Sequence, residues 1–229
     1  LVVVRSTWDY PEHVHDFRDW IGRLEEEARS VANEPGLMRW NLEKTYLLDL
    51  ADRGAPLPPT RLVAPEPDAI AAAMAALRID AAIVKPVVGA SARGLSRVAA
   101  GDPEGLAAAA ARLGGPGLVQ PVLSEIGQVG ETSMIFFGGV YSHAVLKRPA
   151  AGDIRSQKEF GANIEPLRPR PRAVAEAARI LSLCPGAPVY ARIDVVVLDE
   201  RLWLMEVELI EPDLFYDDVP GAADRFADA

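Results

Sequence analysis

The chain lacks the residues on which several common kinds of site depend. Cys184 is the only cysteine in the sequence of 229 residues, so an internal disulfide is excluded. No histidine motif accompanies this thiol, which argues against a cysteine nucleophile. A Gly-x-Ser-x-Gly elbow is absent as well. These absences disfavour a hydrolase that works through a covalent intermediate.

Basic residues are also scarce. The 24 lysines and arginines are outnumbered by 33 aspartates and glutamates, which gives a net charge of −9. No basic cluster alternates with aromatic residues, so the pattern of a nucleic-acid binder is missing. No apolar run approaches the roughly 20 residues that span a bilayer, and no signal peptide is recognisable. We therefore expect a cytoplasmic protein without nucleic-acid or membrane partners.

The composition, with 49% hydrophobic and 25% charged residues, is typical of a globular protein with a substantial core. Helical spacing and alanine-rich runs predict helices over 11–24, 41–54, 103–113 and 171–183, and one that ends near 78. Apolar runs predict strands over 1–4, 60–64, 82–84, 95–98, 118–120, 132–137 and 140–148. Asn41 is expected to cap the second helix. Helices mixed with antiparallel hairpins indicate an α+β fold in two lobes.

Two apolar runs within residues 190–211 are separated by a short polar segment and predict a β-hairpin. If Leu198 pairs with Leu202, all cross-strand partners sum to the same number, and alternation fixes which side chains share a face. The pairs that this register places on one face are Asp194 with Glu206 and Arg192 with Glu208.

Acids that face each other on an apolar sheet need compensation. Like charges directly opposite are destabilising, and carboxylates are costly to desolvate without a cation. A divalent ion held by Asp194, Glu206 and Glu208 explains the pattern, with Arg192 supplying part of the positive charge. Alternatively, this face is open to solvent and the acids are ordinary surface residues.

A glycine-containing loop follows Lys85, which ends an apolar strand. Gly89, Ser91 and Gly94 lie in this loop, where glycine lets backbone N–H groups approach an anion and the lysine adds a charge. The loop lacks the Gly-Lys-Ser/Thr ending of a Walker A motif. It is therefore either a phosphate-binding loop or a plain β-turn beside a surface lysine.

Lys147 and Arg148 end another strand, and Arg155 follows in the next loop. Basic residues at strand ends are commonly solvated edges. Together with a candidate metal site and a glycine loop, they also suit an anionic phosphate, which needs divalent ions and cationic side chains.

Several segments, taken in chain order, resemble the ATP-grasp superfamily. They are Lys44, VKPVVGASARG, QPVLSEIGQVGETS from Gln120, KRPAAGDIRSQ from Lys147, and the ARID and MEVEL strands. Within the superfamily the chain resembles the glutathione-synthetase-like ligases, and more closely the group that includes the cycloserine-forming ligase. Members of that group share RSTWDY-like and ELELIEP-like segments. The match covers nearly the whole chain, and several motifs in the right order make it specific.

The resemblance implies that ATP and Mg²⁺ bind between two antiparallel sheets. Lys44 and Lys85 would reach the phosphates, and the glycine loop, with Gly89, Ser91 and Gly94, would close over them. Gln120 and the backbone near Val122 would border the adenine, and Glu131, or as second choice Glu125, would hold the ribose hydroxyls. The magnesium ligands would be Asp194, Glu206 and Glu208. The cationic side chains expected to act in catalysis are Lys147, Arg148, Arg155 and Arg192.

Two departures from the family pattern stand out. Glu208 replaces the asparagine found in many relatives, which adds negative charge at the metal site. Ala162 follows Gly161 where relatives usually have two glycines. We expect residues 1–36 to be the remnant of an N-terminal domain, 37–120 the first ATP-grasp lobe with its linker, and 121–229 the second lobe with the metal site.

The function implied by the resemblance is ATP- and Mg-dependent ligation of a small carboxylate to an amine or related nucleophile. The carboxylate would become an acyl phosphate, and ADP and phosphate would be released. A carboxylate is already ionised near neutral pH, so the first step needs no base. The alternatives are an ATP-binding module without ligase activity, with a regulatory or assembly role, and an α+β domain whose charges form surface ion pairs. The sequence does not indicate an oligomeric state.

Overall fold

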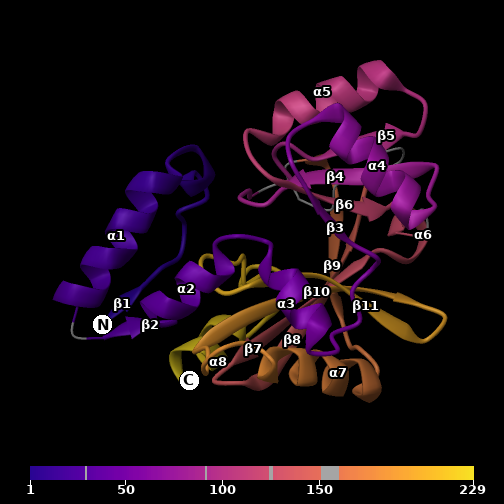
Figure 1. Ribbon diagram of the computed structural model, residues 1–229. Coiled ribbons are helices and arrows are strands. Elements are labelled where there is room, and N and C mark those ends of the chain that lie inside the picture. Colours follow the sequence, from indigo (N-terminus) through magenta and orange to yellow (C-terminus); the bar gives the residue numbers. More distant parts are fainter. Residues whose placement is uncertain (29, 91, 124–125, 151–159) are drawn as a thin grey trace.

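The protein is represented by a computed structural model, which describes residues 1–28, 30–90, 92–123, 126–150 and 160–229. Two antiparallel sheets form the framework of this described part (Figure 1). The smaller sheet has the strand order β3-β6-β4-β5, and the larger one has the order β11-β10-β7-β8-β9. The strands of the smaller sheet are β3 (Arg61–Val63), β4 (Ala81–Pro86), β5 (Ser96–Ala99) and β6 (Gly117–Pro121). Those of the larger sheet are β7 (Glu131–Phe137), β8 (Val140–Arg148), β9 (Asn163–Leu167), β10 (Tyr190–Leu198) and β11 (Arg201–Glu208).

Short helices surround the sheets. Their bounds are η1 (Tyr10–Glu12), α1 (Val14–Glu27), α2 (Pro35–Asn41), α3 (Tyr46–Asp52), α4 (Pro67–Leu77), α5 (Pro103–Leu113), α6 (Ile126–Val129), α7 (Pro171–Ser182) and α8 (Ala222–Ala227). No helix in the described ranges is long and apolar enough to cross a membrane. The helices predicted at 103–113 and 171–183 are confirmed to within one residue.

The alanine-rich helices α4 and α5 cover one face of the smaller sheet (Figure 1). Each begins with a proline, whose fixed φ suits the first helical turn, and Asp102 caps α5 by accepting a hydrogen bond from Gly105 N at 2.9 Å. Ile70, Met74 and Ala109 are fully or almost fully buried between these helices and the sheet. This packing leaves the other face of the smaller sheet available to line a cleft.

One face of the larger sheet is packed against α3 and α7. Leu47 and Leu50 of α3 and Ile180 of α7 are fully buried in this core. Helices α2 and α3 thus pack with the strands of 121–229, which differs from the predicted grouping of 37–120 as one lobe. The domain boundaries themselves stay a prediction.

Asn41 does not cap a helix, contrary to the sequence prediction. It is the last residue of α2, and a new helix, α3, begins only at Tyr46. The Asn41 side chain instead donates to Val207 O at 2.8 Å and accepts from Leu209 N at 2.8 Å. The amide therefore satisfies backbone groups at the end of β11, a long-range contact that local propensity does not reveal.

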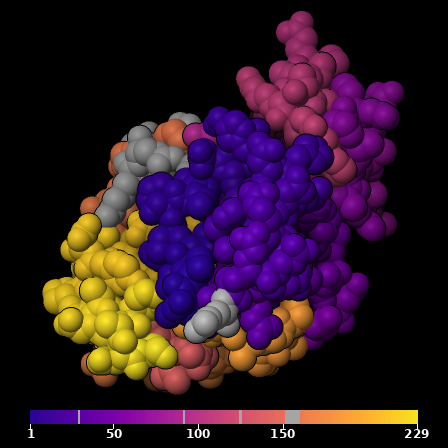
Figure 2. Space-filling view, turned by 90° about the vertical axis from the view of Figure 1, so that its left-hand side faces the viewer, coloured from indigo at the N-terminus to yellow at the C-terminus, as the bar shows by residue number. Residues whose placement is uncertain are grey.

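The N-terminal segment packs beside the end of the larger sheet. Strand β1 (Val2–Val3) pairs in parallel with β2 (Val31–Ala32), and α1 covers them. Figure 2 shows these N-terminal residues between the C-terminal residues and the smaller lobe. Tyr10 stacks on Phe17 with ring centroids 4.9 Å apart, which anchors the segment to α1.

The hairpin predicted within residues 190–211 forms from β10 and β11, but its turn is tighter than predicted. Leu198 pairs with Arg201, so the loop has only two residues, Asp199 and Glu200, both with positive φ. A bulge at Met205 then shifts the register by one residue. This shift restores the predicted pairs, Asp194 with Glu206 and Arg192 with Glu208.

Candidate active site

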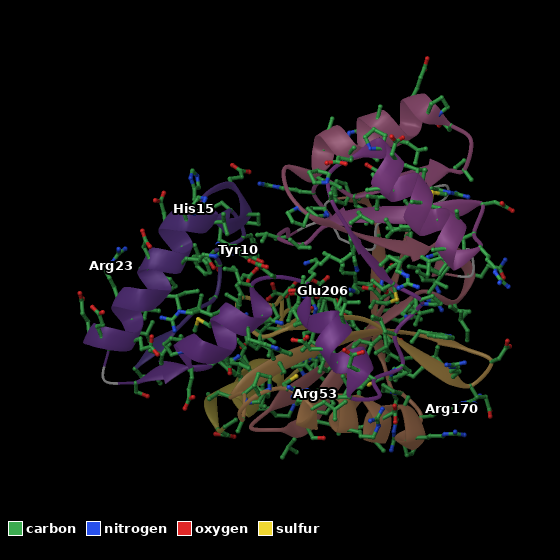
Figure 3. All side chains as sticks on the ribbon, in the orientation of Figure 1. Tyr10, His15, Arg23, Arg53, Arg170 and Glu206 are labelled. Carbon is green, nitrogen blue, oxygen red and sulfur yellow. The ribbon has the colours of Figure 1, made fainter. Side chains whose placement is uncertain are left out.

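A cleft of about 520 Å³ lies between the two sheets. Side chains from both sheets and from the N-terminal segment line it. The predicted site residues in its lining are Lys44, Lys85, Gly89, Gln120, Val122, Glu131, Lys147, Arg192, Asp194, Glu206 and Glu208. Figure 3 shows Glu206 near the centre of the molecule, between the sheets. Predicted residues Ser91, Arg155 and the second-choice Glu125 lie outside the described residues.

Asp194 is the most heavily bonded carboxylate of the cleft. Its Oδ1 accepts from Ser133 Oγ at 2.6 Å and from Arg192 Nε at 3.0 Å, and its Oδ2 accepts from Lys147 Nζ at 3.2 Å. Burial raises the pKa of Asp194, but Arg192 and Lys147 outweigh burial and lower this pKa to about 2. Asp194 is therefore an anion throughout the physiological pH range.

Lys147 and Glu131 face each other across β7 and β8 and form a buried ion pair. Burial alone would lower the pKa of Lys147, but Asp194 and Glu131 raise it above its ordinary value. Burial also raises the pKa of Glu131, with Lys147 opposing that shift. Glu131 is thus already paired with a lysine in the cleft. Its predicted contact with ribose hydroxyls stays a prediction.

Lys44 connects the glycine loop to the metal-site strand. Its Nζ donates to Gly89 O at 2.7 Å and to Glu206 Oε1 at 2.5 Å. Its backbone N–H also donates to Val87 O at 2.7 Å, which fixes the loop from a second point. A lysine held in this way places a positive charge between the loop and the acidic face.

Lys85 supplies a second cation, and within the described ranges its Nζ makes no hydrogen bond or ion pair. Burial lowers the pKa of Lys85 to about 8, although the negative charge of Glu206 acts to raise this pKa. A bound phosphate would compensate this desolvated charge. Lys85 and Lys44 together therefore suit the polyphosphate of a nucleotide.

The remaining acids also face cations. Burial raises the pKa of Glu206, but Lys44 and Lys85 hold it below its ordinary value. Glu208 forms an ion pair with Arg192, yet burial raises the pKa of Glu208 to about 7. The acidic face is therefore matched by lysine and arginine rather than open to bulk solvent, which contradicts the alternative of ordinary surface acids.

The three predicted metal ligands supply the oxygen donors that Mg²⁺ prefers. Asp194 and Glu206 face each other across the hairpin as predicted. Across the described residues, however, no three acidic, histidine or cysteine side chains gather closely enough to share one ion. The donor chemistry fits magnesium, and joint ligation by Asp194, Glu206 and Glu208 stays a prediction.

Gln120 lines the cleft from β6 of the smaller sheet. Its buried amide donates from Nε2 to Thr60 Oγ1 at 2.9 Å. Apolar side chains line the cleft with it, namely Ile83, Ile164 and Met205 from the two sheets and Leu123 from the segment after β6. A fixed amide between apolar walls suits a flat heteroaromatic ring, and the adenine edge at Gln120 stays a prediction.

The structure does not bring Arg148 or Gly94 to the cleft. Successive residues of a strand point to opposite faces, so Arg148 turns away where Lys147 turns in. Its side chain is 42% exposed and pairs with Glu165. Gly94, with φ of +73°, serves the turn after the loop, and any Cβ there would lie 3.2 Å from Arg112 O.

The sequence prediction missed five cleft residues that come from the N-terminal segment and from the segment after β11. They are Trp8, Tyr10, Glu211, Asp213 and Phe215. The only available indication was that they fall within or beside the RSTWDY and ELIEP segments that mark the resemblance to the cycloserine-ligase group.

Two antiparallel sheets enclosing a cleft with lysines near the glycine loop and carboxylates on the facing hairpin define the ATP-grasp fold. The crystal structure of D-alanine–D-alanine ligase from Bacillus anthracis matches with a TM-score of 0.70 at 18% identity, covering 90% of this chain and 69% of that one. The ATP-grasp ligase PsnB, complexed with Mg and ADP, matches with a TM-score of 0.67 at 17% identity, covering 95% and 66%. These likenesses confirm the predicted α+β ATP-grasp fold.

A closer likeness concerns one family. The cycloserine biosynthesis protein DcsG of Streptomyces lavendulae is 34% identical over 247 residues, covering 100% of this chain and 81% of the relative. The crystal structure of D-cycloserine synthetase DcsG matches with a TM-score of 0.88 at 31% identity, covering 99% and 81%. The family described as D-cycloserine synthetase DcsG, N-terminal domain, matches residues 1–33. The chain therefore belongs to the cycloserine-ligase group of the ATP-grasp superfamily and is an ATP-dependent, ADP-forming ligase.

Proposed function

We propose that the protein uses Mg-ATP to activate a substrate carboxylate as an acyl phosphate, which an amine then converts to an amide. The observation that carries this proposal is the opposition of charges in the cleft. Lys44 and Lys85 lie at the glycine loop, and Asp194 and Glu206 lie on the facing hairpin. Phosphoryl transfer needs cations at the phosphates and carboxylates for the metal, and the cleft offers both.

In the first step, a carboxylate oxygen attacks the γ-phosphorus, the bond from that phosphorus to the bridging oxygen breaks, and ADP leaves with the electron pair. The substrate is already ionised, so no base is needed. Lys85, which has no ion pair among the described residues, neutralises charge on the phosphates. Lys44 holds the glycine loop against them. Magnesium, when bound by Asp194, Glu206 and Glu208, would neutralise phosphate oxygens.

In the second step, the amine attacks the acyl carbon, a carbon–nitrogen bond forms, and the carbon–oxygen bond to phosphate breaks. Phosphate leaves with the electron pair and the nitrogen loses a proton. Lys147, which is buried, and Arg192, which is partly buried, flank Asp194 and supply positive charge for the departing phosphate. The protein thus contributes position and electrostatics at both steps.

The first assay is release of ADP from Mg-ATP in the presence of amino acids and related small carboxylates. Because the 34% identical relative is named for cycloserine biosynthesis, precursors and product of that compound head the panel. Stimulated ADP and phosphate release in equal amounts, with a hydroxamate trapped by hydroxylamine, would support the proposal. Binding of ATP without any stimulated release would instead favour an ATP-binding module without ligase activity.

A further inference from the structure

Glu211 is a buried acid that the proposed nucleotide chemistry does not use. Its side chain lines the cleft although the residue is only 8% exposed. Within the described part of the chain, its carboxylate accepts no hydrogen bond and forms no ion pair. The backbone carbonyl of Glu211, by contrast, is fixed, since it accepts from Trp8 Nε1 at 3.0 Å.

Tyr10 is a second polar group of this kind. The residue is 7% exposed and lines the same cleft, and its hydroxyl makes no hydrogen bond to any described residue. Its ring is held by the stack on Phe17, so the hydroxyl has a defined position. Figure 3 shows Tyr10 on the N-terminal side of the cleft, with Glu206 toward the centre.

A buried carboxylate without a partner is costly, because desolvation penalises its charged form. Asp194, Glu206 and Glu208 each have a lysine or arginine within an ion pair, and Glu211 has none among the described residues. Burial and then the nearby Glu208 raise the pKa of Glu211 to about 8. A cation that enters the cleft from solvent would relieve both effects.

The position of this pair in the fold fits a substrate rather than the nucleotide. The Trp8 to Glu211 hydrogen bond joins the N-terminal segment to the segment after β11. These two segments carry the RSTWDY and ELIEP sequences, in which Glu208, a predicted magnesium ligand, is the only residue expected at Mg-ATP. Phe215 also lines the cleft, with the Arg192 guanidinium carbon 5.7 Å from the centroid of its ring.

We propose that Tyr10 and Glu211 form a subsite for the protonated amine of the substrate whose carboxylate is phosphorylated. An alkylammonium group has three N–H donors, and the carboxylate and the hydroxyl both accept. Such a substrate carries an ammonium and a carboxylate together, with the carboxylate directed to the phosphate end of the cleft. This inference rests on the proposed ligase function and assigns Glu211 and Tyr10 as residues that determine specificity.

The test compares free amines with their acylated counterparts in wild type and Glu211→Gln. Amino acids of both configurations and their N-acetyl derivatives serve as probes in the ADP-release assay. We expect wild type to prefer the free amine at least tenfold in kcat/KM, and E211Q to lose most of that preference through KM. The KM for ATP should stay within twofold. Unchanged preference in E211Q would overturn the proposal.

A matched control is Glu165→Gln, which removes one acid outside the cleft. It should retain both the amine preference and the KM values of wild type. Tyr10→Phe keeps the ring stack and removes only the hydroxyl, so we expect a smaller, roughly threefold to tenfold, rise in KM for the amine substrate. Glu211→Asp should restore part of the preference, which a merely structural role would not predict.

A binding experiment separates this inference from the proposed function. Calorimetry with Mg²⁺ and a non-hydrolysable ATP analogue measures the affinity of the same probes without turnover. Free amino acids that bind wild type but not E211Q would support the subsite even if no ADP were released. If wild type bound free and acetylated probes equally, or bound neither, the subsite would be refuted. The ligase function would still be tested separately by the ADP-release assay.

Discussion

At the scale of single residues, Arg192 connects most of the acidic face. It donates to both oxygens of Asp194, pairs with Glu208, and donates from Nη1 to Asp213 O at 3.3 Å. A lysine could not make these contacts together, because its single nitrogen lacks the planar fork of a guanidinium. The rigid arrangement of the carboxylates therefore depends on arginine at this position.

Glu206 tests the assignment of the metal site. Glu206→Gln removes the charge opposite Asp194 and the ion pair with Lys44, while preserving side-chain size. We expect substrate-dependent ADP release to fall by roughly 100-fold or more, because charge stabilisation at the phosphates is lost. Circular dichroism should show an intact fold. Unchanged ADP release in E206Q would refute the metal assignment, and E165Q again serves as the control.

Lys85 predicts a pH dependence of nucleotide affinity. In the protein without nucleotide, burial lowers the pKa of Lys85 to about 8, so the lysine is charged below pH 8 and becomes neutral above it. Bound phosphate favours the charged form, so the contribution of Lys85 to the affinity for Mg-ATP should be constant below pH 8, where any change comes from other groups such as Glu208, whose pKa is about 7. Above pH 8 the affinity should weaken by up to about tenfold per pH unit. Calorimetric titration from pH 6.5 to 9.5 measures this.

The variant Lys85→Arg is the control for that experiment. Arginine stays protonated throughout the same pH range, so the weakening above pH 8 should disappear even if the absolute affinity changes. A wild-type affinity that does not change between pH 7 and 9.5 would show that Lys85 does not titrate in contact with the phosphates.

At the scale of elements, the hairpin of β10 and β11 shows why the sequence predicted the cross-strand pairs of its acids but not its turn and its bulge. Alternation placed Asp194 and Glu206 on one face correctly, because a period of two is local. The two-residue turn and the bulge at Met205 cancel each other, and no local pattern announced either. The prediction for Arg148 was wrong in geometry because it overlooked the same alternation within β8.

The turn itself carries a stability prediction. Glu200 adopts φ of 63°, which is strained for a residue with a Cβ, and its pair with exposed Arg170 contributes little. Glu200→Gly should raise the free energy of unfolding by about 0.5 to 1 kcal/mol, since relief of strain exceeds the extra chain entropy. Urea denaturation measures the change.

A glycine substitution within a helix should have the opposite effect. Ala72→Gly, at an exposed position in α4, should lower the free energy of unfolding by about 1 kcal/mol in the same urea experiment.

At the scale of the whole molecule, the sequence predicted the fold class and most of the cleft, because the motifs are short and carry their own strands and loops. It did not predict the subsite at Tyr10 and Glu211, which forms only when opposite ends of the chain meet. The core shared by α3 and β11 was missed for the same reason, since apolar periodicity reports that a face is buried but not against which partner.

The cleft between the sheets predicts how the nucleotide affects global stability. Lys44 and the carboxylates of the hairpin line one side of the cleft, and Lys85 and Gln120 of the smaller sheet line the other. A ligand that binds only this folded arrangement stabilises it by about 2.7 kcal/mol at a free concentration 100 times its dissociation constant. We expect Mg-ATP to raise the thermal midpoint, and ATP with excess chelator to raise it less, because the carboxylates then lack their cation. E206Q should lose the difference between the two conditions. A midpoint that Mg-ATP leaves unchanged in wild type would contradict nucleotide binding between the two sheets.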